Sequence, residues 1–286
     1  MSAQITPLEC TRLIREYDFP VQKKYGQNFI TDPGVLEAIV RASGITKEDV
    51  VLEIGPGMGA LTSYLLKAAQ KVIAVEIDRM LIPILKDTLK DYDNLVLIND
   101  DILKTDLDSL IASEAGGKKI KVAANLPYYI TTPVVMELLE KQKNIESITV
   151  MVQKEVAERM QTGPGSKAYG ALSLAVQYYS KPEIFMTVSK NCFVPRPEVD
   201  SAVINLDIYE PENRPVRVKD EEKMFKIIRA AFNQRRKTLP NSLANAASLN
   251  FSKAEVNAAL EKMGLPLTIR GEALTLEEFA RLSDLL

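Results

Sequence analysis

The chain has 286 residues, of which 46% are hydrophobic and 26% charged, as is typical of a soluble globular protein with one large and one smaller domain. It contains no histidine, which excludes nucleophilic dyads that depend on imidazole and most kinds of zinc site. A net charge of −2 and a pI near 5.6 argue against a protein that coats nucleic acid non-specifically.

Membrane and secretory segments are not expected. No apolar run approaches the ~18 residues that a membrane span needs, and the first 15 residues carry charges without an apolar segment, unlike a signal peptide. Cys10 and Cys192 lie far apart, and neither has a partner at metal-ligand spacing. We therefore expect a cytoplasmic protein with no metal.

Apolar strand-like runs alternate with helical patterns over the first two thirds of the chain, which predicts an α/β fold with a parallel sheet and crossover helices. A hydroxyl cap and a proline also mark a helix start at 131–133. The expected strands are 50–54, 71–75, 95–98, 119–124 and 147–152, and the expected helices include 60–69 and 79–90.

Two later strands, 183–188 and 201–208, have no clear helix between them, so we expect an antiparallel pairing at one sheet edge. The segment 209–215 carries two prolines and alternating charges, and it is the best candidate for a domain boundary. We expect a catalytic domain over 1–211 and a helical domain over 212–286. The helices expected in the second domain are 219–233, 240–247, 252–263 and 275–285.

The first predicted strand runs into a glycine turn at Gly55, Gly57 and Gly59. Glycines at alternate positions let the backbone turn sharply and approach a ligand closely. The spacing is G-x-G-x-G, not the G-x-G-x-x-G of dinucleotide enzymes, so a nucleoside or amino-acid tail is favoured over a pyrophosphate. A generic turn between a strand and a helix is the alternative interpretation.

Two carboxylates follow the next two strands. Glu76 ends the second strand, where an acid can bind both ribose hydroxyls. Asp101 comes just after the third strand and can accept a hydrogen bond from an adenine amine. Either acid alone could be an ordinary surface residue. Because ligands of such sheets bind at the carboxyl ends of the strands, the two acids and the glycine turn together predict one nucleoside site.

The stretch Asn125-Leu126-Pro127-Tyr128 follows the fourth strand at the same edge. An exocyclic adenine amine is a poor nucleophile, because its lone pair is delocalised into the ring. The Asn125 side-chain oxygen and the Leu126 carbonyl can accept both amine protons, and the Tyr128 ring can stack on the base. An ordinary proline turn is the alternative.

A basic segment lies in the second predicted domain. From Arg214 to Lys237 there are nine basic and three acidic residues, a net charge of +6 in an otherwise acidic chain. Arg235, Arg236 and Lys237 are adjacent within it. Such a run is either a solvated helix face or a grip on a nucleic-acid backbone.

These features together resemble the class I S-adenosylmethionine-dependent methyltransferases, and almost end to end the chain resembles the rRNA adenine dimethyltransferases. Residues 125–128 resemble the N/D-P-P-Y/F signature of adenine-N6 methyltransferases, with Leu126 in place of the first proline. Residues 24–30 resemble an N-terminal cofactor motif, and 193–201 resemble the F-x-P-x-P-x-V-x-S segment. Residues 231–239 resemble the small-subunit branch of the family.

The resemblance implies a Rossmann-like methyltransferase domain that uses S-adenosylmethionine to dimethylate two adjacent adenosines in the 3′-terminal hairpin loop of 16S rRNA, within an immature 30S subunit. A monomer is expected. Asn125, Leu126, Tyr128 and Phe193 would hold the target adenine, although Phe193 could instead be a core aromatic. Arg235, Arg236 and Lys237 would contact RNA. The implied cofactor residues are Asn28, Ile30, Gly55, Gly57, Glu76, Ile77, Asp101, Ile102 and Asn125.

Three rival functions stay open at this point. One is the sister activity on 23S rRNA that gives macrolide resistance. The second is a ribosome-assembly factor for which binding matters more than methylation. The third, an NAD-dependent dehydrogenase, has the wrong glycine spacing and no obvious proton relay.

Overall fold

The computed structural model describes residues 7–20, 22, 26–141 and 144–286. These residues form two compact units, Met1–Ala157 with Lys181–Ile208, and Glu158–Ser180 with Tyr209–Leu286. The predicted boundary after residue 211 lies close to the break at 208/209. The segment Glu158–Ser180, however, packs with the C-terminal unit and not with the predicted first domain.

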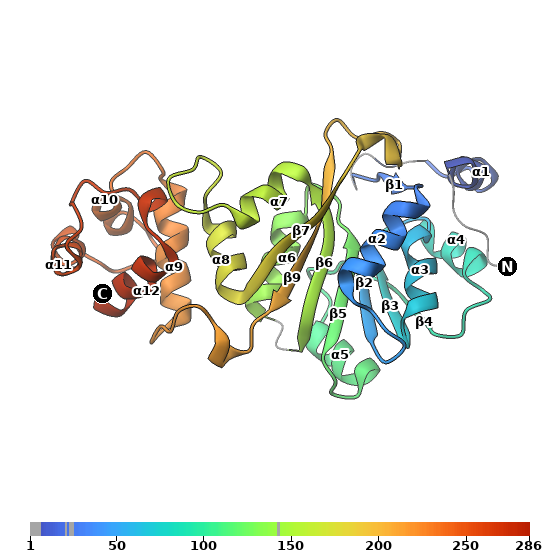
Figure 1. Ribbon diagram of the computed structural model, residues 1–286, viewed down its shortest axis with the longest axis horizontal. Coiled ribbons are helices and arrows are strands. Elements are labelled where there is room, and N and C mark those ends of the chain that lie inside the picture. The colour runs from blue at the N-terminus through green and yellow to red at the C-terminus, as the bar shows by residue number, and fades with distance from the viewer. Residues whose placement is uncertain (1–6, 21, 23–25, 142–143) are drawn as a thin grey trace. The chain divides into compact units, whose positions relative to one another are not determined.

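A seven-stranded sheet is the centre of the first unit, in the order β4-β3-β2-β5-β6-β9-β7 (Figure 1). The five strands from β4 to β6 are parallel, as expected. Their bounds are β2 Val50–Ile54, β3 Lys71–Glu76, β4 Leu95–Asn99, β5 Ile120–Asn125 and β6 Ile145–Gln153. The predicted α/β class with a Rossmann-like sheet is therefore confirmed.

The helices between parallel strands are α3 (Ala60–Ala68), α4 (Leu81–Thr88), α5 (Leu107–Ala115) and α6 (Thr131–Lys141). Right-handed crossovers place α3 and α4 on one face of the sheet and α5 and α6 on the other. All five residues of β2 are buried, as befits a central strand covered on both faces. The chain leaves β2 for β3 on one side but returns to β5 on the other. The gap above the carboxyl ends of β2 and β5 is thus the switch point where ligands bind.

The antiparallel edge is also confirmed. β9 (Ser201–Ile208) runs antiparallel to β6, with Ser201 opposite Gln153, and β7 (Ser180–Val188) forms the edge beyond it. β7 alternates between exposed and more buried residues, as an edge strand does when one face meets solvent.

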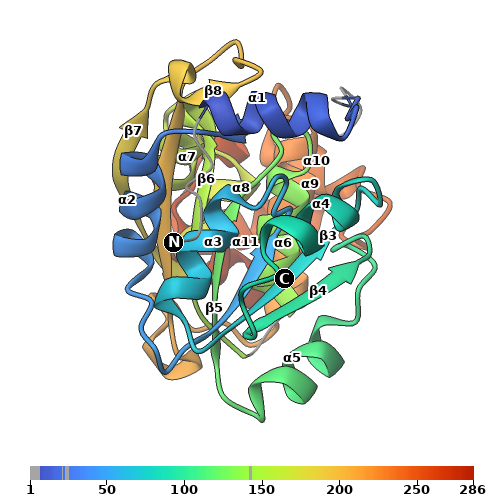
Figure 2. The same ribbon diagram turned by 90° about the vertical axis from the view of Figure 1, so that its right-hand side faces the viewer.

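A second, two-stranded sheet was not predicted. β1 (Phe29–Ile30) pairs antiparallel with β8 (Phe193–Val194), which places Ile30 opposite Phe193. Helix α1 (Pro7–Glu16) packs against β8 (Figure 2). Two segments about 160 residues apart in the chain are therefore held side by side at the mouth of the switch point.

Helix α2 (Pro33–Ser43) was also missed, although the signals for it are present in the sequence. The Asp32 side chain caps it by accepting hydrogen bonds from Gly34 and Val35, and Pro33 is its first residue. Gly44 ends it at φ 55°, in the left-handed region that favours glycine.

The second unit is helical. Its elements are the end of α7 (Lys154–Gln161), α8 (Ala171–Tyr179), α9 (Glu221–Asn233), α10 (Leu239–Ala244), α11 (Lys253–Met263) and α12 (Leu276–Leu285). Their core centres on α9, where Phe232 contacts the rings of Tyr169 and Phe279 at centroid distances of 5.7 and 6.2 Å. The predicted helices agree with α9 to α12 apart from small shifts at their ends.

Aromatic contacts explain why Glu158–Ser180 belongs to this unit. Tyr178 and Tyr179, at the end of α8, both donate hydrogen bonds to the Glu221 carboxylate at the start of α9, at 2.9 and 2.6 Å. Arg214 also bonds Glu221 and lies over both tyrosine rings, about 5 Å from each centroid. Helices α7 and α8 directly follow β6 in the chain. A prediction from sequence order alone therefore placed this segment in the first domain.

Gly271 sets the closest approach to α9 in this unit. A Cβ atom at this position would lie 2.7 Å from the Cβ of buried Ala231. We expect Gly271→Ala to lower the free energy of unfolding by about 1–3 kcal/mol, because the added methyl overpacks the contact. Urea unfolding measures this. Gly163→Ala is the matched control, since a Cβ there meets nothing within 4 Å; equal stability of the two variants would contradict the packing argument.

Candidate active site

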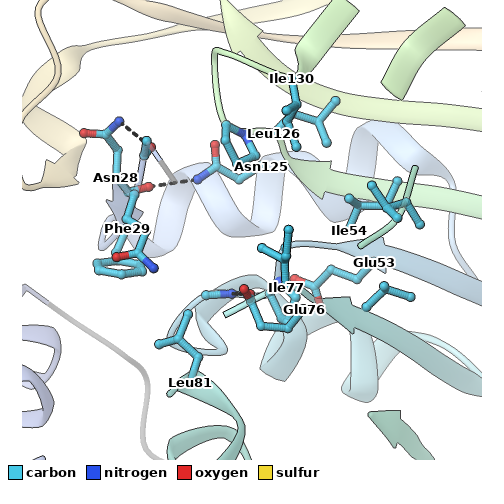
Figure 3. A pocket seen from close by; sticks show the side chains of 18 of the residues that line it. Asn28, Phe29, Glu53, Ile54, Glu76, Ile77, Leu81, Asn125, Leu126 and Ile130 are labelled. Atoms are coloured by element: carbon cyan, nitrogen blue, oxygen red, sulfur yellow. Dashed lines mark hydrogen bonds between the residues drawn. The ribbon is translucent and has the colours of Figure 1, made fainter. Parts of the chain in front are cut away.

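A pocket opens at the switch point, above the carboxyl ends of the parallel strands (Figure 3). Its walls come from the segment before β1, the turns after β2, β3, β4 and β5, and the start of β8. All the predicted cofactor and adenine residues line it, namely Asn28, Ile30, Gly55, Gly57, Glu76, Ile77, Asp101, Ile102, Asn125, Leu126, Tyr128 and Phe193. Strand order predicted that the glycine turn, Glu76, Asp101 and the Asn125 turn lie together, and the family resemblance added Asn28, Ile30 and Phe193; the structure brings both sets to one pocket.

The glycine turn after β2 forms the floor of the pocket. Gly55 and Gly57 have φ values of 68° and 60°, in the left-handed region where a side chain would be strained. A Cβ at Gly57 would also lie 3.1 Å from the Phe29 ring. Only glycine therefore leaves the backbone exposed to a ligand at this turn.

Glu76 is held by backbone donors at the end of β3. Its carboxylate accepts hydrogen bonds from the Gly57 and Asp78 amides, at 3.1 and 2.8 Å. Only 4% of the residue is exposed. Burial outweighs these donors and raises the pKa of the Glu76 carboxyl to about 7. A ligand that adds hydroxyl donors would favour its charged form.

Glu53 is a pocket residue that was not predicted from the sequence. It lies near the carboxyl end of buried strand β2, is 1% exposed, and one of its carboxyl oxygens has no hydrogen-bond partner among the described residues. Burial, together with the charge of Glu76, raises the pKa of Glu53 to about 8. Glu53 and Glu76 lie on the same side of the pocket, across from Asn125 (Figure 3). An acid inside an apolar strand pattern was the signal that could have found it.

Asn125 is oriented by the N-terminal segment. Its side-chain amide nitrogen donates to the Asn28 backbone carbonyl at 3.0 Å (Figure 3). The Asn28 side chain in turn donates to the Gly26 carbonyl at 3.1 Å. Because one N–H of the Asn125 amide is engaged on this carbonyl, the amide is held in one orientation, with its oxygen directed away from Asn28.

Tyr128 and Phe193 line the same pocket as Asn125, and each is held in place by different contacts. The Tyr128 hydroxyl is 2.9 Å from the Ser201 hydroxyl at the start of β9, and Ser201 is fully buried. Phe193 is held in the β1–β8 ladder. It is 4% exposed and packs in the apolar core, yet it also lines the pocket. The two interpretations of Phe193, as core aromatic and as pocket aromatic, both describe it.

Asp78 connects the N-terminal segment to the end of β3. One of its carboxylate oxygens accepts from the side chains of Gln22 and Gln27, at 3.0 and 2.9 Å. The other accepts from the Met80 amide at 3.1 Å. This network holds Gln22 and Gln27 against the end of β3.

The three predicted RNA contacts lie in the second unit, in the turn between α9 and α10, and they are not equivalent. Arg235 forms an ion pair with Glu272 at 3.0 Å and donates to the Lys167 carbonyl at 2.9 Å. Arg236 and Lys237 are exposed. Arg235 therefore stabilises the unit itself, whereas the other two are available to a partner.

Within the described parts of the chain, no group of three or more acidic or cysteine side chains is placed to hold a metal ion. Over the same residues, every helix is too short or too polar to cross a bilayer.

The model of the ribosomal RNA adenine dimethylase family matches residues 19–283. The chain belongs to this family. The ribosomal RNA small subunit methyltransferase A of Lachnoclostridium phytofermentans is 57% identical to it, over 98% of this chain and 96% of that protein. The protein of the same name from Clostridioides difficile is 47% identical, over 96% and 93% of the two chains.

Solved structures of rRNA adenine dimethyltransferases match the fold of this chain. A dimethyladenosine transferase from Plasmodium falciparum matches with a TM-score of 0.72 and 29% identity, over 89% of this chain and 95% of that one. The 23S rRNA methyltransferase ErmE matches with a TM-score of 0.66 and 23% identity, over 91% and 99%, which shows the common fold. The chain is therefore an S-adenosylmethionine-dependent methyltransferase of rRNA adenines, and the dehydrogenase alternative is excluded.

The two buried acids predict how stability depends on pH. Both carboxyls have pKa values above their ordinary 4.5, so the folded protein keeps protons that the unfolded chain releases. Their contribution is complete below pH 4.5 and is lost as the pH rises through 7 and 8. We expect the free energy of unfolding of the cofactor-free protein to fall between pH 5 and 8.5.

Glu53→Gln tests this directly, because an amide cannot ionise. The variant should lose less stability than the wild type between these pH values in urea unfolding. Glu198→Gln, at an exposed position, serves as the control and should keep the wild-type slope. If the free energy of unfolding of all three proteins changed with pH in the same way, Glu53 would be ionised in the folded protein over this whole pH range.

Proposed function

We propose that this enzyme transfers methyl groups from S-adenosylmethionine to N6 of two adjacent adenosines in the 3′-terminal hairpin loop of 16S rRNA, within an immature 30S subunit. The observation that carries the proposal is the Asn125 amide. Its donor is fixed on Asn28 at 3.0 Å and its oxygen is left for a substrate amine. The names of the relatives support the small subunit as substrate over the 23S alternative.

The pocket fits the cofactor. The glycine turn provides exposed backbone, and a Cβ at Gly57 would crowd the Phe29 ring at 3.1 Å. Glu76 provides a buried acceptor for ribose hydroxyls, and Asp101 lies at the end of the next strand, where it can accept from an adenine amine. When bound, S-adenosylmethionine supplies a methyl group on a sulfonium, which is an excellent leaving group. Asn28, Ile30, Gly55, Ile77 and Ile102 complete the walls.

The residues of the chain act by positioning. The Asn125 oxygen and the Leu126 carbonyl accept the two amine protons of adenine and stabilise positive charge as it develops on the nitrogen. Tyr128 and Phe193 hold the plane of the base. Alignment of the nitrogen with the methyl group can lower the barrier by roughly 7–11 kcal/mol. The proton leaves to water, so no histidine is needed.

The same reasoning suits an RNA hairpin. A base in a duplex must be flipped at a cost of a few kcal/mol, whereas a loop offers unstacked bases. The exposed Arg236 and Lys237 would bind the phosphate backbone. We also propose that the enzyme works as a monomer in the cytoplasm, where ribosomes mature. Methylation would accompany small-subunit maturation.

Asn125→Ala is the test of the central assignment. Loss of the amide removes one of the two acceptors, so we expect methyl transfer to undermethylated 30S subunits to fall by about 10²-fold or more. Thermal unfolding should show an intact fold. The exposed Asn213→Ala is the control and should keep wild-type activity. Full activity of the Asn125 variant would refute its role.

The RNA contacts are tested by reversing Arg236 and Lys237 together to Glu. Arg235 is left unchanged because it pairs with Glu272. We expect weaker binding to the 30S particle. The slope of log binding constant against log salt concentration should become less steep by about 1–2, as for the loss of one or two phosphate contacts. The pair Lys86→Glu and Lys118→Glu makes the same charge change at exposed sites of the first unit. If both double variants bind alike, only net charge matters and the contact is rejected.

A further inference from the structure

A second tyrosine follows Tyr128 directly. Tyr129 also lines the pocket. It is 52% exposed. The roles assigned above to the four residues 125–128 do not use it.

The backbone explains the contrast between the two tyrosines. The Ile130 amide donates to the Pro127 carbonyl at 3.1 Å, so residues 127–130 form a β-turn with Tyr128 and Tyr129 at its two central positions. Tyr128 is half-buried and held by Ser201. Tyr129 projects from the same turn into solvent. Two consecutive rings thus stand at the pocket, one inside it and one at its rim.

Tyr129 is also held in place at its base. A Cβ at Gly26 would lie 3.3 Å from Cδ1 and 3.7 Å from Cε1 of the Tyr129 ring. One edge of the ring therefore rests on the Gly26 backbone, where the absence of a side chain makes room for it. An aromatic ring with one supported edge and a large exposed area loses little side-chain freedom when a planar ligand stacks on it.

We propose that Tyr129 is a stacking subsite for the nucleobase next to the target adenine. The inference rests on the proposed function, because it needs an RNA whose target base is bound at Asn125. When one adenosine enters the pocket, the RNA backbone places the adjacent nucleotide at the rim of the pocket. Every base has a π-face, and stacking of one base on an aromatic side chain contributes roughly 1–3 kcal/mol. For two adjacent adenosines, the subsite holds one of them while the other reacts.

Three substitutions separate stacking from other roles. Steady-state methylation of undermethylated 30S subunits should show a KM for the subunit about tenfold higher in Tyr129→Ala, in line with the loss of one stacked base. Tyr129→Phe keeps the ring and should stay within about twofold of the wild type. Tyr129→Leu keeps apolar volume without a planar face and should resemble the alanine variant.

Two controls exclude a structural effect. Affinity for S-adenosylmethionine, measured by calorimetry, should be the same in all Tyr129 variants; a parallel loss would mean that the ring only supports the Gly26 segment. Phe185→Ala removes an aromatic that is 48% exposed on edge strand β7 and outside the pocket. It should behave as the wild type.

The partner of the ring is identified with altered RNA. Two altered subunits are prepared, each with one of the two target adenosines changed to uridine, which stacks more weakly. The KM of the wild-type enzyme should rise for one of these two subunits. That same change should have little further effect on Tyr129→Ala, as expected for groups that interact. Independent, additive effects would overturn the subsite, as would a leucine variant equal to wild type.

The outcomes keep the two proposals apart. If the wild-type enzyme fails to methylate the subunits, the proposed function is wrong. If the wild type methylates them and Tyr129→Ala does so with an unchanged KM, only the subsite is wrong. A KM increase that is equal for Ala, Leu and Phe would point to the hydroxyl and would also reject stacking.

Discussion

A single hydrogen bond fixes the orientation of the Asn125 side-chain amide in the pocket. An asparagine amide has a donor end and an acceptor end, and the two are similar in shape. Because the Asn28 carbonyl takes the donor end of Asn125 at 3.0 Å, the acceptor end is presented to the substrate. The Asn28 side chain, the Gly26 backbone and the β1–β8 ladder all keep that carbonyl in place. Without it the amide could rotate and oppose a substrate amine with its own NH₂ group.

The electrostatics of the opposite wall follow another principle. Glu53 and Glu76 are both buried, and their pKa values rise to about 8 and 7. Both carboxyls therefore tend to hold their protons near neutral pH, and hydroxyl donors of a ligand would favour the charged form of Glu76. Rigid acceptors on one wall and an adjustable carboxyl on the other suit two different ligands: an amine that must be aligned closely, and a ribose that must be exchanged after each turnover.

Much of this could be predicted from the sequence, since long-range order in a parallel sheet follows from simple periodicity. Apolar runs, helical patterns and strand ends placed the glycine turn, Glu76, Asp101 and Asn125 at one edge, and the structure brings all four to one pocket. Pairings between distant short segments could not be predicted in this way. The two-residue strands β1 and β8 are too short to show a recognisable hydrophobic pattern. The segment Glu158–Ser180 joins the second unit through hydrogen bonds of Tyr178 and Tyr179, which the local sequence does not predict. Similarly, charge alone did not separate Arg235, bonded to Glu272, from its exposed neighbours.

The two-residue ladder between β1 and β8 constrains how this protein can evolve. Ile30 faces Phe193 across it, and in a strand a shift of one residue turns every side chain to the opposite face. An insertion or deletion in either short segment would swing Phe193 or Ile30 away from the ligands, unless a matching length change arose some 160 residues away. Gains and losses of residues should therefore accumulate elsewhere, in loops such as the exposed turn at 163–165, and leave these two stretches unaltered in length.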